Sequence, residues 1–189
     1  MTVANIQTIK MTADQYFAMG QDPPGVRLEL IDGELIVSAS PNPRHADVIA
    51  NLTYILMGHI KPRKLGKLYP DTDVPFEKFV VRRPDLSFYA SANLRRVTAE
   101  RLLGPPDLCI EVLSPGNVDD DRTNKFNLYQ KHRVPHYWMI DPDERTAECF
   151  KLVKGAYTLI SSAGGDATAH FAPFPDLAIP LSDLWMPGL

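Results

Sequence analysis

The order of apolar and polar residues predicts two β-hairpins. In each one, two apolar runs flank a pair that favours a tight turn, Asp32-Gly33 in the first and Lys154-Gly155 in the second. The Asp-Gly pair is the stronger signal, because a two-residue hairpin turn needs backbone conformations that aspartate and glycine adopt readily. The four strands are predicted at residues 27–31, 34–37, 146–152 and 156–161.

Apolar residues at helical spacing predict two longer helices and one short helix. The first longer helix covers residues 44–59 and is expected to end because Pro62 follows. The second covers residues 119–132, and its three opening aspartates match the positive end of the helix dipole. A short helix over residues 13–19 is predicted to have Thr12 as its N-cap.

The remaining apolar segments predict buried strands of a single α/β domain that spans residues 1–189. Residues 108–113 are apolar except for Glu111, which is typical of a central strand covered on both faces. The 119–132 helix joins this strand to the next, which predicts a right-handed parallel βαβ unit. The strands are expected at residues 65–69 and 73–81 (these two segments being two strands or together one bent strand), 83–89, 108–113 and 136–140.

Composition and charge narrow the classes of function. The chain of 189 residues is 44% hydrophobic with a formal net charge of −3, so only a local basic patch could attract nucleic acid. Cys109 and Cys149 lie in strand-like runs without metal-type spacing, which indicates buried thiols in a reducing, cytoplasmic setting. No apolar run approaches the length of a membrane helix, so no membrane partner is expected.

Two carboxylates lie inside otherwise apolar strands, Asp85 in one and Glu111 in the other. A buried carboxylate is costly unless it is paired or binds a cation. On neighbouring strands, about 4.8 Å apart, the two side chains could share one divalent ion. Oxygen ligands without histidine or thiolate favour Mg²⁺ or Mn²⁺. The alternative is ordinary ion pairing, in which the partner of Asp85 would be Arg82, Arg83 or Lys78.

Several longer motifs surround these carboxylates. They are Glu29-Leu30-Ile31-Asp32-Gly33-Glu34-Leu35, Ser40-Pro41-Asn42-Pro43-Arg44-His45, Pro84-Asp85, Glu111-Val112-Leu113-Ser114-Pro115, Asp121-Arg122-Thr123-Asn124-Lys125-Phe126-Asn127-Leu128-Tyr129 and Val134-Pro135-His136-Tyr137-Trp138-Met139-Ile140-Asp141-Pro142. Together they resemble the Uma2 family of endonucleases, a branch of the PD-(D/E)xK nuclease superfamily. The resemblance covers about residues 12–185, which is nearly the whole chain.

The resemblance implies a restriction-endonuclease-like core with β-hairpins added at both ends. That core consists of a helix, a three-stranded antiparallel meander, a second helix and a fourth strand. The implied activity is that of an endonuclease hydrolysing DNA phosphodiester bonds, with Mg²⁺ or Mn²⁺ bound by Asp85 and Glu111. Leu113 stands where the superfamily has its lysine, and the matching lysine of Uma2-like sequences is Lys125 on the following helix. We therefore expect Lys125 to orient or activate the attacking water and to stabilise the developing anion.

Two further residues are candidates for the active site. His45 starts the 44–59 helix, where the superfamily often places an additional active-site residue; the alternative is a structural or exposed histidine. Glu29 is a candidate for an acid linked to the metal; the alternative is a salt bridge with Arg27, Arg44 or Lys61.

Three more polar residues near these motifs have simpler interpretations. Asp121 is interpreted first as a helix cap, and Asp107 as a turn or capping residue. Tyr129 lies one helical turn after Lys125, on the same helix face, so it is expected to pack there or to line the site.

Basic residues could form a rim that holds a DNA backbone, with little sequence readout because no base-reading element is visible. A homodimer is expected, since two sites related by a two-fold axis cut both strands of a duplex most easily. The residues of the basic rim would be Lys61, Arg63, Lys64, Lys67, Arg82, Arg83, Arg95 and Arg96.

Two competing hypotheses remain for the function: a catalytically silent module that binds nucleic acid or protein, and a metal-dependent hydrolase of a smaller phosphoester.

Overall fold

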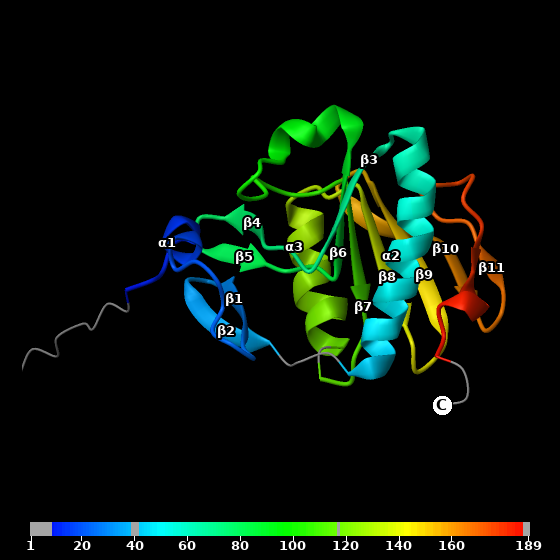
Figure 1. Cartoon of the computed structure of the whole chain (residues 1–189), viewed down its shortest axis with the longest axis horizontal. Helices are drawn as coiled ribbons and strands as arrows, with labels where there is room; N and C mark the ends of the chain where they lie inside the picture. The colour runs from blue at the N-terminus through cyan, green and yellow to red at the C-terminus, as the bar shows by residue number, and fades with distance from the viewer. Residues whose placement is uncertain (1–8, 39–41, 117, 187–189) are drawn as a thin grey trace, which may run out of the picture.

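The structure, a computed structural model, describes residues 9–38, 42–116 and 118–186 and has a mixed α/β fold (Figure 1). In spatial order, the larger sheet contains β10 (Ala156–Gly164), β9 (Thr146–Val153), β8 (His136–Asp141), β7 (Leu108–Val112), β6 (Leu86–Ala90) and β3 (Gly66–Pro70). The smaller sheet contains β2 (Glu34–Ser38), β1 (Arg27–Ile31), β5 (Val80–Arg82) and β4 (Val74–Glu77). A third, two-stranded sheet pairs β11 (Thr168–Ala169) with β12 (Ile179–Pro180).

Within the described residues, six helical segments accompany the sheets. They are α1 (Ala13–Ala18), α2 (Pro43–Arg63), the 3₁₀ segment η1 (Ser91–Arg96), the π-helical segment η2 (Asp120–Lys125), α3 (Phe126–Lys131) and the 3₁₀ segment η3 (Leu181–Asp183). No helix in the described part of the chain is long and apolar enough to cross a membrane.

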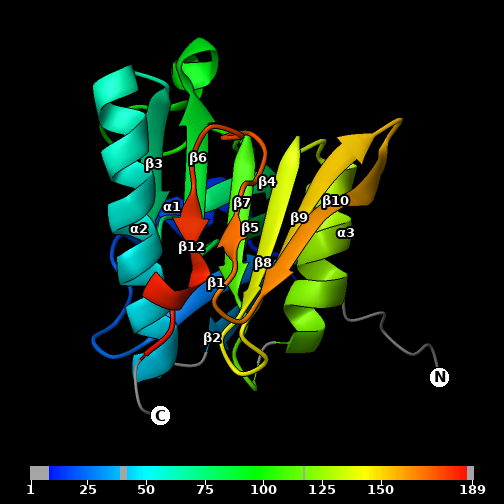
Figure 2. The ribbon, with the colours of Figure 1, turned by 90° about the vertical axis from the view of Figure 1, so that its right-hand side faces the viewer.

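Helix α2 covers one face of the larger sheet, and α3 lies on the opposite side of it (Figure 2). The core-facing stripe of α2 is fully buried against β6, β7 and β8, together with the segment around β12 and η3. Burying each such aliphatic side chain contributes about 1.5–3 kcal/mol, so this stripe fixes the helix on the sheet. Its members are Val48, Leu52, Leu56 and Ile60.

The opposite face of the larger sheet is covered by α3 and by the smaller sheet. The aromatic rings of Tyr129, Tyr137 and Phe76 pack together there, between α3, β8 and β4. Strand β7 is therefore covered on both faces, and all five of its residues are buried. This position explains the continuous apolar run around Glu111.

Both predicted hairpins are confirmed by the strand pairing. In the first, β1 and β2 are antiparallel, and Asp32 (φ 50°) and Gly33 (φ 84°) both have positive φ, as a type I′ turn requires. In the second, β9 pairs with β10 around Lys154-Gly155. The predicted parallel unit is also confirmed, because β7 and β8 are parallel and η2 and α3 connect them.

Other predicted boundaries need correction. Residues 73–81 form two strands, β4 and β5, which leave the larger sheet and join the smaller one. Asp85 lies one residue before β6 and not inside a strand. Helix α2 continues through Pro62 to Arg63, because a proline in the last turn removes only one hydrogen bond near the helix end. Residues 168–169, which lie outside every predicted strand, form β11.

Candidate active site

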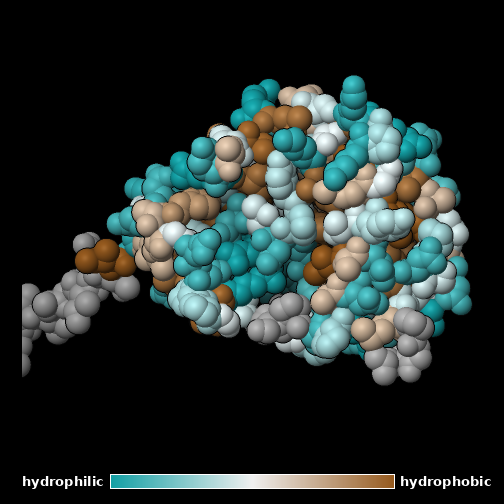
Figure 3. Space-filling view, viewed as in Figure 1, coloured by the Kyte–Doolittle hydropathy of each residue, from teal (hydrophilic) through white to brown (hydrophobic). Residues whose placement is uncertain are grey.

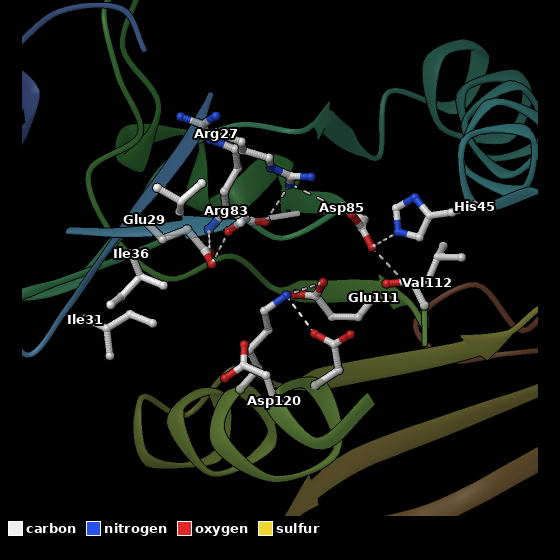
Figure 4. Close-up of a pocket in the computed structure, with 15 residues that line it drawn as sticks. Arg27, Glu29, Ile31, Ile36, His45, Arg83, Asp85, Glu111, Val112 and Asp120 are labelled. Carbon is white, nitrogen blue, oxygen red and sulfur yellow. Dashed lines mark hydrogen bonds and ion pairs between the residues drawn. The ribbon is translucent and has the colours of Figure 1, made fainter. Parts of the chain in front are cut away.

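A cavity of about 220 Å³ lies between the β1–β2 hairpin, the first turns of α2 and the start of η2 (Figure 4). Hydrophilic residues gather over β1 and β5 on the face shown in Figure 3. The ionisable side chains that line the cavity are Arg27, Glu29, His45, Arg83, Asp85, Glu111, Asp120, Asp121 and Lys125. All five residues predicted for the site, Asp85, Glu111, Lys125, His45 and Glu29, thus line one cavity.

The antiparallel register of β6 and β7 places Asp85 beside Glu111. Leu86 pairs with Ile110, so the residue before Leu86 is opposite the residue after Ile110, and opposite residues point to the same face. The Asp85 carboxylate accepts a hydrogen bond from the backbone N–H of Val112 (2.8 Å). This bond ties Asp85 to β7.

Asp85 is held in its charged form by its neighbours. Its Oδ2 lies 3.2 Å from His45 Nε2, and its Oδ1 lies 3.9 Å from a terminal nitrogen of Arg27. Burial alone would raise the pKa of Asp85, but the hydrogen bond with His45 and the positive charge of Lys125 lower it below its ordinary value. Asp85 is therefore an anion inside the protein.

Glu111 is held at both oxygens by side chains from the following helical segments. Lys125 Nζ donates to Oε2 (2.8 Å), and the Tyr129 hydroxyl donates to Oε1 (2.6 Å). Glu111 is fully buried, and burial together with the negative charges of Asp121 and Asp85 raises its pKa to about 8, despite the nearby Lys125. Burial is the largest cause of this raised pKa.

The π-helical geometry of η2 brings Asp121 and Lys125 to this cluster. Lys125 Nζ lies 2.7 Å from Asp121 Oδ1, and both side chains are buried. Burial raises the pKa of Asp121. Burial would lower the pKa of Lys125, but Glu111 and Asp121 raise it above its ordinary value, so the ammonium stays protonated. Single π turns inside helices occur frequently at functional sites.

Asp121 is a correction to the sequence interpretation. It makes no side-chain cap, and the residue before η2 is Asp119, which makes none either. Its carboxylate points to a buried lysine because the wider π turn directs it into the protein. Tyr129, interpreted as packing or lining, does both: it is buried in the aromatic cluster and hydrogen-bonds Glu111.

Glu29 occupies the side of the cavity formed by the smaller sheet. It accepts hydrogen bonds from the Arg83 backbone N–H (2.6 Å), from Arg82 Nε (3.2 Å) and from the Ser38 hydroxyl (3.2 Å). Arg82 also pairs with Asp120 of η2. Glu29 therefore has an arginine partner, as the alternative interpretation required, although that partner is Arg82 and not one of the three that were expected.

His45 reaches the cavity because α2 begins two residues before it. The Asn42 side chain caps the helix by accepting a hydrogen bond from the His45 backbone N–H (2.9 Å). The imidazole is buried against Asp85, and its Nδ1 has no hydrogen-bond partner among the residues that the structure describes. His45 therefore lines the cavity beside Asp85, and a role for it in catalysis stays a prediction.

Comparison with known proteins assigns the chain to a family. The family model described as "Uma2: Putative restriction endonuclease" matches residues 13–182. The chain belongs to the Uma2 family. Among solved structures it is similar to "a putative nuclease belonging to DUF820" from Anabaena variabilis, with a TM-score of 0.74 and 22% identity over 93% of this chain and 97% of that one. At this identity the likeness shows a shared fold. No curated protein matches the chain.

The cavity of this Uma2 chain is lined by more carboxylates than cationic side chains. Among the described residues, five carboxylates and three permanently cationic side chains line it, and Arg82, which lies outside the lining, pairs with two of those carboxylates, Glu29 and Asp120. No group of three or more His, Cys, Asp or Glu side chains in the described ranges is arranged to hold a metal ion. Mg²⁺ commonly needs only one or two protein carboxylates, with water and substrate phosphate as its other ligands. The residues present therefore fit such an ion.

Three ionisable lining residues were assigned from the sequence neither to the site nor to the basic rim: Arg27, Asp120 and Asp121. Arg27 appeared only as a salt-bridge partner, and the two aspartates appeared as helix-start residues. The pattern of apolar residues does not identify them as lining residues, because their side chains point into the cavity only through the position of the β1–β2 hairpin and through the π turn of η2. The DxxxK spacing of Asp121 and Lys125 was the one available signal, since residues four apart face each other on a helix.

The basic residues predicted to form one rim lie in separate places in the structure. Arg82 and Arg83 are not surface residues: Arg82 pairs with Glu29 and Asp120, and Arg83 pairs with Asp73 and Asp22. Neither of them pairs with Asp85, whose arginine neighbour is Arg27 and not one of the partners that the ion-pairing alternative named. The lysines at the other end of α2 line a separate hollow beside β3, roughly 24 Å along the helix from His45. They are Lys61, Lys64 and Lys67.

Proposed function

We propose that this chain is a metal-dependent endonuclease that hydrolyses DNA phosphodiester bonds on a restriction-endonuclease-like core. One observation carries the proposal: Asp85, Glu111 and Lys125 come from three different segments and line the same buried cavity. Membership of a family described as restriction endonucleases supports the same chemistry. The order β3-β6-β7-β8, with α2 on one face and α3 on the other, supports the proposed core.

Asp85 and Glu111 would hold the metal, because the register of β6 and β7 puts the two residues opposite each other and both line the cavity. A bound Mg²⁺ or Mn²⁺ supplies electrostatic stabilisation of the negative charge that develops on the phosphate. Asp85 is suited to this role since its pKa lies below the ordinary value and it binds cations without first losing a proton. Val112 N–H and His45 fix its orientation.

Lys125 acts as a cation in this proposal. Its pKa is raised by Glu111 and Asp121, so it is not a base that removes a proton from water. A protonated lysine can donate hydrogen bonds to a phosphate oxygen or to the attacking water and can stabilise the anion that forms. Asp121, 2.7 Å from its Nζ, positions it.

Arg27 is the residue best placed to bind the scissile phosphate. It lines the cavity next to Asp85, and its buried Nε has no hydrogen-bond partner among the described residues. Its ion pair with Asp71, whose side chain is 61% exposed, is weak enough to be exchanged for a phosphate. An arginine can form two parallel hydrogen bonds to a phosphate group.

The size of the cavity favours a polymer over a small phosphoester. Pockets that enclose a complete small ligand usually measure about 300–1,000 Å³. This cavity measures about 220 Å³, which suits a phosphate group whose flanking nucleotides remain outside. DNA backbone contacts with little base readout follow from such an arrangement.

Nicking of supercoiled plasmid tests the proposal. We expect the wild type to nick DNA with Mg²⁺ or Mn²⁺ and not with EDTA. Asp85→Asn and Lys125→Met should each reduce the rate at least about 100-fold, which is typical for loss of a group that stabilises the transition state. Lys151→Met, an exposed lysine on β9, serves as the matched control and should retain the wild-type rate. Absence of cleavage by the wild type with either metal would leave the catalytically silent module as the better description.

A further inference from the structure

The outer edge of β2 is unlike the other edges of the two larger sheets. Edge strands expose unpaired backbone groups, and proteins usually protect them with proline, lysine or a bulge. Strand β4 has Pro75 and a register shift, β10 has a bulge after Leu159, and β3 has Lys67 and ends at Pro70. Strand β2, Glu-Leu-Ile-Val-Ser, has none of these features, and no strand in the described ranges pairs with its outer side.

Three consecutive apolar residues are exposed on this edge. Leu35, Ile36 and Val37 have 37%, 41% and 67% of their surface exposed. No other run of three large apolar residues in the described part of the chain is exposed. A flat, apolar and unprotected edge is a site for pairing with another strand.

The hydrogen-bond pattern of the hairpin shows which groups are free. Ile31 and Glu34 close the two-residue turn and form a hydrogen-bonded pair. Along an antiparallel ladder, hydrogen-bonded pairs alternate with non-hydrogen-bonded pairs. The backbone groups of Glu34 and Ile36 are therefore bonded to β1. The N–H and C=O groups of Leu35 and Val37 therefore point outward. They are the groups that a further strand would bond.

We propose that β2 pairs antiparallel with β2 of a second copy of this chain, which joins the two four-stranded sheets across a two-fold axis. Only one symmetric register uses all three exposed apolar residues. In it, Leu35 of each copy bonds Val37 of the other, and the two Ile36 residues meet on the axis.

The chemistry of the strand favours a second copy over a charged partner. Within this register, Glu34 is opposite a serine, Ser38, so no like charges meet. An isologous contact of this kind closes on itself and leaves no free β2 edge. Ile36 and Val37 also line the candidate active site, so the two cavities of the dimer would flank the axis.

Cross-linking tests the register directly. The two Ile36 residues form a non-hydrogen-bonded pair, with Cα atoms about 4.5 Å apart, which is within the range that a disulfide spans. We expect Ile36→Cys to form a disulfide-linked dimer when treated with diamide. Leu159→Cys, on the bulged edge of β10, is the matched control and should not. The native Cys109 and Cys149 are buried and do not compete.

Analytical ultracentrifugation supplies the second measurement, without DNA or metal, so its result is independent of the proposed nuclease activity. The wild type at about 50 µM should sediment as a dimer, because an interface of this kind needs no cofactor. Leu35→Glu should sediment as a monomer, whereas Val153→Glu, at a similarly exposed apolar position on β9, should remain dimeric. A monomeric wild type, a dimeric Leu35→Glu variant, or equal cross-linking of the two cysteine variants would overturn the proposal.

Discussion

At the scale of single residues, Tyr129 and Lys125 each hold one oxygen of Glu111. The carboxylate therefore has a fixed orientation in a strand that is buried on both faces. A carboxylate oxygen has more than one lone pair, so both oxygens can still bind a cation while they accept these hydrogen bonds. Hydrogen bonds of this kind around a metal ligand typically change metal affinity by about 10- to 100-fold.

Replacement of Tyr129 by phenylalanine tests this role. Tyr129→Phe leaves Glu111 Oε1 without its donor, which should lower the free energy of unfolding by about 2 kcal/mol. It should also weaken Mn²⁺ binding by about 10-fold. Urea denaturation and metal titration measure the two effects.

Tyr89→Phe is the matched control for that substitution. The Tyr89 hydroxyl is also buried and donates to the Gly104 carbonyl (2.7 Å), away from the cavity. This variant should lose comparable stability and bind Mn²⁺ as the wild type does. Equal loss of Mn²⁺ affinity in both variants would show that Tyr129 acts only on the fold.

At the scale of elements, the beginnings of two helical segments determine the site. Helix α2 begins at its Asn42 cap and presents His45 in its first turn, while η2 presents Asp121 and Lys125 through a π turn. Strands β6 and β7 supply a rigid base through their register. Small changes at either helix start should therefore alter the site without disturbing the sheet.

The Asn42 cap offers a test at this scale. Asn42→Ala removes the side chain that accepts from His45 N–H, which should cost about 1 kcal/mol of stability. Because the first turn also carries the His45 ring, we expect DNA nicking to fall more than stability alone explains. Thr12→Ala removes the corresponding cap of α1 and should lower stability with little change in nicking. Parallel losses of activity in the two variants would contradict the role of the α2 cap.

Local signals made many of these elements predictable from the sequence. Asp32-Gly33, the helical spacing of Val48, Leu52 and Leu56, and the apolar run around Glu111 each depend on neighbouring residues only. The family resemblance, and not local pattern, led to Lys125. Nothing local distinguishes the π turn of η2 from an ordinary helix start. The sequence therefore did not show that Asp121 points inward.

At the scale of the whole molecule, ion pairs join the smaller sheet to η2 and to the end of α3, which cover the same face of the larger sheet. Arg82 of β5 connects Glu29 of β1 with Asp120 of η2. Glu77 of β4 accepts from Lys131 and lies 2.8 Å from His132 Nε2 at the end of α3. These contacts join segments 38 to 55 residues apart in sequence, which is why the sequence alone could not pair them.

The Glu77 contact predicts an acid dependence of stability. Hydrogen bonds from Lys131 and His132 lower the pKa of Glu77 in the folded protein below its ordinary value. Its stabilising contribution is therefore complete above the unfolded-state pKa, about 4.3, and is lost as the pH falls through the folded-state pKa.

Glu77→Gln removes this titration. The variant should be less stable than the wild type at pH 7, and the difference should shrink as the pH falls below about 4. Urea denaturation across pH 3–7 measures it, with Glu100→Gln, an exposed position, as the control. A stability difference that does not change with pH would show that the contact contributes by packing and not by charge.

The central claim is that Asp85 and Glu111 together hold a divalent cation. Titration with Mn²⁺, followed by electron paramagnetic resonance of the free ion, tests it most directly. We predict one bound Mn²⁺ per chain in the wild type, and affinity at least about 10-fold weaker in both Asp85→Asn and Glu111→Gln. A wild-type chain that binds no Mn²⁺ at millimolar concentration, or variants that bind it as tightly as the wild type, would contradict the account.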